Sequence, residues 1–511
     1  MIARVSHRHV ASALCVAALL VASAVLAAPK PKGGHAVPNV LTVQRPWPPV
    51  VTVRIVVGSG SLADPAGQEG MAQLCWSAAL RGAGDKDRAQ FAQALEALGA
   101  HVDTTVDKMG ATVIGEVLAD QLDAFLPLLA DVVLRPRFET AEIDKARTQQ
   151  LGDLVHLRDE DESLAHDAIG RYLYRGQLLG RPTGGTEQSL ARIQPADVRA
   201  WHKHQIAQGN VHMGFAGDID PQRAQLLTQK YFADLPAGHT AARPAPAHPV
   251  LAGRRLLLLD KSRRSQAQIV LAQSAPPVGH RDHIALLVAN TVLGGTFSSR
   301  LTHEIRELRG WSYHAWSSLA AGPGLSTLAL GFAPANADAA ASLDLAVRIV
   351  EELQHEGITP AELRFAKDYL KGAHRFSLET ADRELDQRLR AAHLGLPADE
   401  IDTFAARVEA VDLKTANRVL HDHLHAQHMV GVVVGSGKAL TEKLSNVAAQ
   451  FTVEVMPAAA APETSKGQGR VGGTLRPEPP EQPPPKVDED GELQGPPEEG
   501  DPTDDDASES P

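Results

Sequence analysis

The stretch "EGMAQLCWSAALRGAG", residues 69–84, predicts a short helix over residues 70–81 that ends near two glycines. Residues spaced three and four apart share a helix face, and on one face these are Gln73, Trp76, Ser77 and Leu80. The other side carries Met71, Leu74, Cys75 and Ala78. Because both sides are mostly apolar, we expect a buried helix with an unreactive thiol.

The order of elements around this helix occurs twice in the chain. "TAEIDKAR" (140–147) matches "PAELRFAK" (360–367), and "HQIAQGNVHMGFAGD" (204–218) parallels "HLHAQHMVGVVVGSG" (423–437). Solenoid repeats are roughly 20–50 residues long. This repeat is about 220 residues long, so it indicates a duplicated domain.

Each copy begins with a predicted strand, at 50–61 and at 267–277. A helix leading to a glycine pair follows, and then long amphipathic helices, of which 119–134 and 339–354 are the clearest. A short apolar strand closes each copy. Strands mixed with helices, without strict βαβ alternation, predict an α+β fold. We place the first domain at 40–240, a Pro- and Ala-rich linker at 241–254 and the second domain at 255–456.

The first 28 residues predict a signal peptide. Arg4 and Arg8 precede an apolar run, Val10–Leu26, which two alanines follow. We therefore expect an exported protein, periplasmic or extracellular, although an uncleaved membrane anchor is the alternative. The mature chain would keep one cysteine, Cys75, and so no intramolecular disulfide. We expect no membrane span in the mature chain.

The last segment, 457–511, is rich in proline and acidic residues and is predicted to be disordered. It holds 14 acidic and 4 basic residues, which leaves the rest of the chain with a net charge of about −2. Such a chain offers no basic stripe for nucleic acid. The simplest role for the tail is to keep the protein soluble.

The opening helix resembles the metal-binding helix of the pitrilysin (insulysin-like) zinc peptidases. In that family an H-x-x-E-H motif lies between the corresponding alanine and glycine, and a distant glutamate completes the zinc site. The matching positions here are Gln73, Trp76 and Ser77, with the distant position near Asp153. An amide and a hydroxyl are poor zinc ligands, and an indole cannot accept a proton. The resemblance therefore implies a family member with no metal in this helix.

The resemblance extends from about Val50 to Thr452 and includes "VVLRPRF" (132–138) and "GFAGDID" (214–220). Its most specific part is "LGGTFSSRLTHEIRELRGWSYHAWSS", residues 293–318. This run contains the family patterns L-G-G-x-x-S-S-R-L and R-E-x-R-G-x-x-Y.

In two-subunit bacterial members of the family, an Arg and a Tyr of this run bind the substrate backbone. The corresponding residues here are Arg306 and Tyr313, and Gly294, Gly295 and Ser299 would shape the adjoining loop. From the residues alone, Arg306 could instead form a salt bridge within a helix, and Tyr313 could pack at the start of a strand.

The resemblance implies a non-catalytic subunit of a heterodimeric peptidase. Two pitrilysin-type domains would form half of a clamshell around a peptide substrate, and a homologous partner would supply zinc and the general base. The chain itself would need no cofactor. Two alternatives stay open: a peptide-binding or assembly protein without hydrolysis, possibly homodimeric, and a peptidase with a different metal site.

Two histidine-rich runs could supply that metal site. "HDHLHAQH" (421–428) would place His421 and His425 on one helical face, and "HRDH" (280–283) has histidines three residues apart. We expect a solvated helix end for the first run and a structural or surface role for the second.

Overall fold

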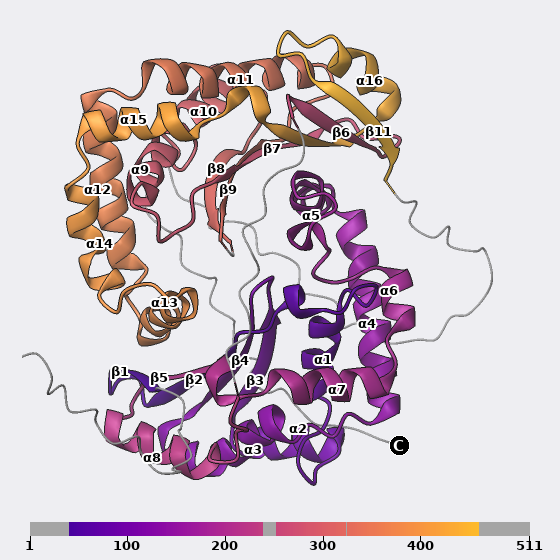
Figure 1. Ribbon diagram of the computed structural model, residues 1–511, viewed down its shortest axis with the longest axis vertical. Helices are drawn as coiled ribbons and strands as arrows, with labels where there is room; N and C mark the ends of the chain where they lie inside the picture. The colour runs from indigo at the N-terminus through magenta and orange to yellow at the C-terminus, as the bar shows by residue number, and fades with distance from the viewer. Residues whose placement is uncertain (1–39, 239–251, 323, 459–511) are drawn as a thin grey trace, which may run out of the picture. The chain divides into compact units, whose positions relative to one another are not determined.

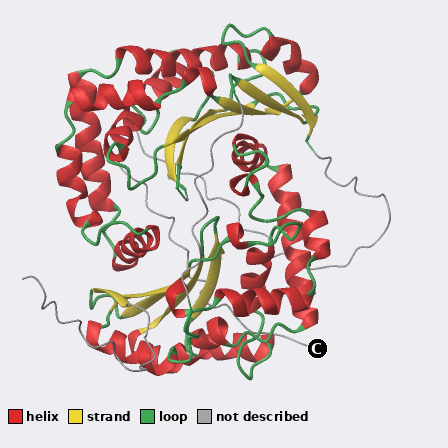
Figure 2. Ribbon diagram, in the orientation of Figure 1, coloured by secondary structure: helices red, strands yellow, loops and turns green. Residues whose placement is uncertain are grey.

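The computed structural model describes residues 40–238, 252–322 and 324–458, whose helices and strands are drawn in Figures 1 and 2. The predicted signal peptide, most of the predicted linker and nearly all of the acidic tail lie outside the described residues. Among the described helices, none is both long enough and apolar enough to cross a bilayer.

The first copy contains a five-stranded sheet and eight helices of six or more residues in its described part. They are, in chain order, β1 (Val40–Gln44), β2 (Val50–Val57), α1 (Met71–Ala79), α2 (Arg88–Ala97), β3 (His101–Val106), β4 (Ala111–Leu118), α3 (Leu122–Leu134), α4 (Thr140–Asp159), α5 (Asp161–Leu173), α6 (Glu187–Arg192), α7 (Pro195–Gln205), β5 (Val211–Gly217) and α8 (Pro221–Tyr231).

The second copy repeats this plan with a six-stranded sheet. Its described elements are β6 (Arg255–Asp260), β7 (Gln268–Ala275), α9 (His283–Leu293), α10 (Arg300–Thr302), β8 (Ala315–Ala321), β9 (Ser326–Phe332), α11 (Ala339–Glu356), α12 (Pro360–Phe376), α13 (Ala381–Leu394), α14 (Glu400–Glu409), α15 (Leu413–His423), β10 (Val430–Gly435), α16 (Gly437–Ser445) and β11 (Thr452–Pro457).

The two sheets share one strand order. The first runs β1-β5-β2-β4-β3, and the second runs β6-β10-β7-β9-β8 with β11 added beside β6. In both sheets the first strand is parallel to the closing strand, so that Val40 lies opposite Met213 and Arg255 lies opposite Val430. The closing strand is antiparallel to its other neighbour in each copy. This equivalence confirms the α+β fold and the duplicated domain.

The strand sequences explain which strands of these sheets are covered on both faces. Every residue of β10, "VGVVVG", is buried, and β2, "VVTVRIVV", is buried along most of its length. A nearly continuous run of β-branched residues is typical of a strand that packs on both sides. By contrast, β4 has buried residues at alternating positions, as expected for a strand with one covered face.

Each copy contributes one helix to the sheet of the other copy. Helix α5 contacts β7 and β10, and its apolar residues form one buried cluster with those of the second sheet. In return α13 contacts β1 and β5, where Leu385 and Leu389 pack on Val43 and Ala216. The buried apolar area of these contacts ties the two copies together.

Polar contacts reinforce this exchange of helices. The phenol of Tyr172, on α5, donates a hydrogen bond to Glu454 over 2.9 Å. Arg54, which is buried in β2, donates through Nε to Asp386 of α13 over 3.0 Å. Because a buried guanidinium is costly without a charged partner, this ion pair fixes how α13 lies on the first sheet.

The sequence prediction gave each copy an opening and a closing strand, and it missed the other strands, which are β1, β3 and β4 in the first copy and β6, β8, β9 and β11 in the second. It placed the first strands at 50–61 and 267–277, which correspond to β2 and β7, whereas β1 and β6 precede them. The predicted helix over 70–81 is observed as Met71–Ala79. The segment predicted as a helix at 119–134 contains α3, and the one predicted at 339–354 lies within α11.

Candidate functional site

Helix α1 begins at a tightly built turn. Asp64 accepts hydrogen bonds from the backbone N–H groups of Gly70 and Ala72, over 2.8 and 2.9 Å. Gly70 has a φ of +92°, and a Cβ atom there would lie 2.8 Å from the carbonyl oxygen of Gly184. Burial raises the pKa of Asp64 to about 7, and the backbone hydrogen bonds from Ala72 and Gly70 oppose that rise. The turn therefore requires both the carboxyl group and the glycine.

In α1, the three positions that correspond to the family's H-x-x-E-H motif form a packed, neutral surface. Gln73 and Ser77 are half-buried, and Gln73 Nε2 donates a long hydrogen bond to Ser77 Oγ over 3.5 Å. Trp76 is fully buried, and its ring lies edge-on to His202 with 5.7 Å between the ring centroids. His202 is also 5.2 Å from the ring of Phe138. The indole thus belongs to the apolar core of the first copy.

The distant position of the metal motif belongs to α4. Asp153 lies on the exposed side of α4, as expected for a plain surface carboxylate. The buried side of α4 instead presents Gln150, whose Nε2 donates to the carbonyls of Gly70 and Gly184 over 3.1 and 3.0 Å. An amide, a hydroxyl and a buried indole do not fit a zinc ion, which prefers imidazole, thiolate and carboxylate ligands.

The buried thiol and the buried imidazole nearest to this helix are also unsuited to catalysis. Burial raises the pKa of the Cys75 thiol well above its usual range, so the thiol stays protonated. Burial lowers the pKa of His202 to about 4, which keeps the imidazole neutral at physiological pH. The helix and its surroundings therefore perform a structural role in this chain.

The second predicted site has a different construction. Helix α10 continues directly into a π-helical turn, His303–Glu307, in which the N–H of Leu308 bonds to the carbonyl of His303 over 3.0 Å. Single π-turns are rare and occur frequently at functional sites. Arg306 lies on this turn.

The guanidinium of Arg306 lies over two aromatic rings. It is 4.8 Å from the ring centroid of Phe297 and 5.0 Å from that of Tyr313. These two rings are 70% and 73% exposed, an unusual state for large aromatic side chains. No carboxylate among the described residues forms an ion pair with Arg306, whereas its neighbour Arg309 pairs with Glu304 over 2.5 Å. The two alternatives from the sequence, a salt bridge of Arg306 within a helix and a packed Tyr313 at the start of a strand, therefore do not describe this arrangement.

The loop before Arg306 depends on close backbone packing. A Cβ atom on Gly294 would lie 2.5 Å from the backbone nitrogen of Ser317, and one on Gly295 would lie 2.9 Å from Thr291 Cα. Ser299 is buried, and its hydroxyl donates to Thr302 over 3.0 Å. These residues position the loop that carries Phe297. Phe297 was missed because its place in the motif tolerates any residue, and an aromatic residue in a loop was the only signal.

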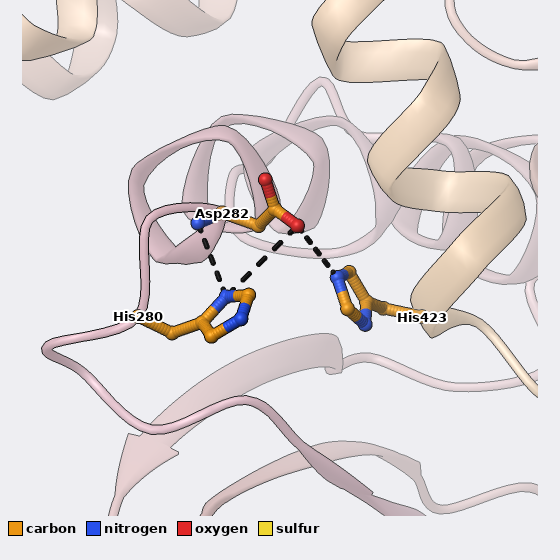
Figure 3. A group of neighbouring side chains, drawn as sticks. All are labelled: His280, Asp282 and His423. Atoms are coloured by element: carbon orange, nitrogen blue, oxygen red, sulfur yellow. Dashed lines mark hydrogen bonds and ion pairs between the residues drawn. The ribbon is translucent and has the colours of Figure 1, made fainter.

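The structure joins the two histidine-rich runs in one group. His280, Asp282 and His423 each offer a ligand atom, and these atoms lie within 4.8 Å of one another (Figure 3). The expected pairing of His421 with His425 is wrong, because α15 ends at His423. His283 is buried within α9, where burial lowers its pKa to about 4, in keeping with a structural role.

The fold and the two sites define a duplicated α+β chain. It has the family's Arg and Tyr motif but not the family's metal-binding motif. The family model described as "Insulinase (Peptidase family M16)" matches residues 39–187, and the one described as "Peptidase M16 inactive domain" matches residues 192–370. The chain belongs to peptidase family M16, the insulinase-like family that includes the pitrilysins.

The chain is similar both to a protein described as a zinc protease and to one described as a non-peptidase homolog. It is 25% identical over 410 residues to an uncharacterized zinc protease of Mycobacterium leprae, covering 80% of this chain and 92% of that protein. It is 24% identical over 387 residues to the non-peptidase homolog YmxG of Helicobacter pylori, covering 75% and 88%.

Solved structures support the fold. A peptidase M16 inactive domain from Pseudomonas fluorescens matches with a TM-score of 0.72 and 25% identity, covering 78% of this chain and 96% of that one. A protease from Helicobacter pylori matches with a TM-score of 0.72 at 18% identity, covering 79% and 97%.

Proposed function

We propose that this chain is the non-catalytic subunit of an exported, heterodimeric M16 peptidase. A homologous partner with an intact H-x-x-E-H helix supplies zinc and the general base. This chain supplies Arg306 and Tyr313, which hold the peptide substrate at the partner's metal. The description of one relative as a non-peptidase homolog agrees with a non-catalytic role.

One observation carries the proposal, namely the contrast between the two motifs. The metal helix is packed as core around a fully buried Trp76. The Arg306 side chain, by contrast, lies over two exposed rings and forms no ion pair with a described carboxylate. A guanidinium has five N–H donors, and an unpaired one in this setting can bind peptide carbonyls.

Tyr313 suits the same role. Its side chain is 73% exposed, so the hydroxyl can reach a bound substrate. A tyrosine hydroxyl can donate to a scissile carbonyl and stabilise the oxyanion that forms as water attacks. The zinc and the general base come from the partner, because the residues in this chain's helix do not fit the metal.

The test uses this chain and a candidate partner, purified separately and together. Unfolded-peptide cleavage is measured with and without a chelator. We expect no cleavage by this chain alone and chelator-sensitive cleavage by the mixture. Cleavage by the lone chain contradicts the proposal. Binding of a labelled peptide without cleavage by any mixture favours a peptide-binding protein instead.

A matched pair of variants examines Arg306 within the complex. Arg306→Ala should lower kcat/KM at least tenfold without preventing assembly, since a lost charge-assisted hydrogen bond costs about 1.5–3 kcal/mol. Arg309→Ala is the control, because Arg309 lies three residues away and pairs with Glu304. Equal effects of the two substitutions would remove Arg306 from the proposed site.

A further inference from the structure

We propose that His280, Asp282 and His423 bind a divalent transition metal such as Zn²⁺, which links the start of α9 to the end of α15. The site is separate from the family's metal helix and does not depend on the proposed function. Two imidazoles and a carboxylate are ligand types that zinc prefers.

The distances suit a tetrahedral ion. Asp282 Oδ2 lies 3.0 Å from His423 Nε2 and 3.9 Å from His280 Nδ1. Bonds of zinc length would place neighbouring ligand atoms roughly 3.3 Å apart. These two separations lie on both sides of that value, and all three ligand atoms lie within 4.8 Å of one another. His280 is part of the loop before α9 and its side chain is 37% exposed, so its ring can move the remaining distance.

Hydrogen bonds already join the members of the group (Figure 3). The backbone N–H of Asp282 donates to His280 Nδ1 over 3.2 Å, so this nitrogen is the acceptor in the pair. A bound ion would take the place of this long hydrogen bond.

Neighbouring side chains act as outer partners of the site. Arg418 donates through Nη2 to Asp282 Oδ1 over 2.6 Å and through Nη1 to Oδ2 over 3.3 Å, which orients the carboxylate while Oδ2 also faces His423. Arg418 is also paired with Asp422 over 3.0 Å, so its charge is shared. The buried Gln273 donates to the carbonyl of His423 over 2.6 Å and holds the end of α15 in place. Hydrogen-bonded ligands of this kind are typical of protein metal sites.

The sequence separates these ligands by 141 residues, from Asp282 to His423. A metal at this point would therefore connect two segments that are distant in the chain. Because the ion binds the folded state and finds no assembled site in the unfolded chain, it should raise the thermal midpoint by a few degrees when in large excess over its Kd.

The test measures metal binding by the full chain after treatment with a chelator. Zn²⁺ affinity is determined by competition with a chromophoric chelator, and Co²⁺ is used to record the visible spectrum of the bound ion. We expect one equivalent with the absorption of a four-coordinate site. His280→Ala and His423→Ala should each weaken binding at least tenfold and abolish that spectrum.

The control is His421→Ala, because His421 lies on the same helix, is 73% exposed and is outside the group. It should bind metal as the unchanged protein does. Far-UV circular dichroism confirms that each variant is folded, and His280→Ala is the safer variant because its position is partly exposed. The proposal is overturned if no equivalent binds below about 100 µM Zn²⁺, or if all three variants bind alike.

Discussion

Replacing His202 with asparagine should make the stability of the first copy less dependent on pH. His202 lies on α7, is only 6% exposed and packs against Trp76 and Phe138. Burial lowers its pKa from 6.5 to about 4, although its hydrogen bond with the Val133 backbone works in the opposite direction. At pH 5 the imidazole is therefore neutral in the folded protein and protonated in the unfolded chain.

The size of this effect on the free energy of unfolding follows from the pKa values of His202 in the unfolded and folded states. A folded-state pKa below the unfolded value gives stability that is present above pH 6.5 and is lost as the pH falls toward 4. The cost to the folded state is about 0.2 kcal/mol at pH 7 and about 2 kcal/mol at pH 5. Asparagine cannot take up a proton in this range and keeps an N–H donor for the Val133 carbonyl. The stability that the substitution itself loses through poorer packing should be the same at both pH values.

The assay is urea unfolding at pH 7, 6 and 5, followed by far-UV circular dichroism. The stability gap between the unchanged protein and His202→Asn should narrow by about 2 kcal/mol from pH 7 to pH 5. Asp64, whose pKa burial raises to about 7, acts with the opposite sign but is present in both proteins and cancels. His101→Asn, on an exposed position of β3, is the control. A gap that stays constant with pH would refute the reasoning.

Three further results are expected. Trp76→Ala should lower the free energy of unfolding by about 3–5 kcal/mol, measured by urea unfolding, while Trp76→Phe should cost under about 2 kcal/mol because it keeps most of the ring. The double variant Gln73→His with Ser77→His should bind Zn²⁺ weakly in a competition assay but show no peptide cleavage, since Trp76 cannot act as a base; chelator-sensitive cleavage would contradict this. Gly294→Ala should destabilise the second copy by about 1–3 kcal/mol in urea, because its Cβ atom would lie 2.5 Å from the nitrogen of Ser317; an unchanged midpoint would show that the loop can move.

Local sequence patterns predicted where helices and strands form better than they predicted which other elements these pack against. The helix around Trp76 could be predicted because both of its faces are apolar, and the repeat predicted the duplicated domain. Periodicity indicates which face of a helix is buried but does not identify what covers it. The exchange of α5 and α13 between the copies was therefore missed, as was the pairing of Arg54 with Asp386.

The candidate sites divide in the same way. Family motifs identified Arg306 and Tyr313, because these residues follow a fixed spacing. The stacking of Phe297 on Arg306 depends on the π-turn and on the packing of Gly294, and both are properties of the backbone path. The group of His280, Asp282 and His423 could not be foreseen, since its two histidine runs are far apart in the sequence and come together only in the folded second copy.

The stability of the fold can explain the residues around Trp76 but not those around Arg306. Around Trp76 the neighbouring rings of His202 and Phe138 are buried as well, so apolar packing accounts for an indole at this position. A carboxylate at that position would need the whole neighbourhood to repack. At Arg306 the two stacking rings are 70% and 73% exposed, and folding gains little from an arrangement that leaves most of their surface in water. A cation held over exposed rings is better explained by a ligand that covers it than by the stability of the chain.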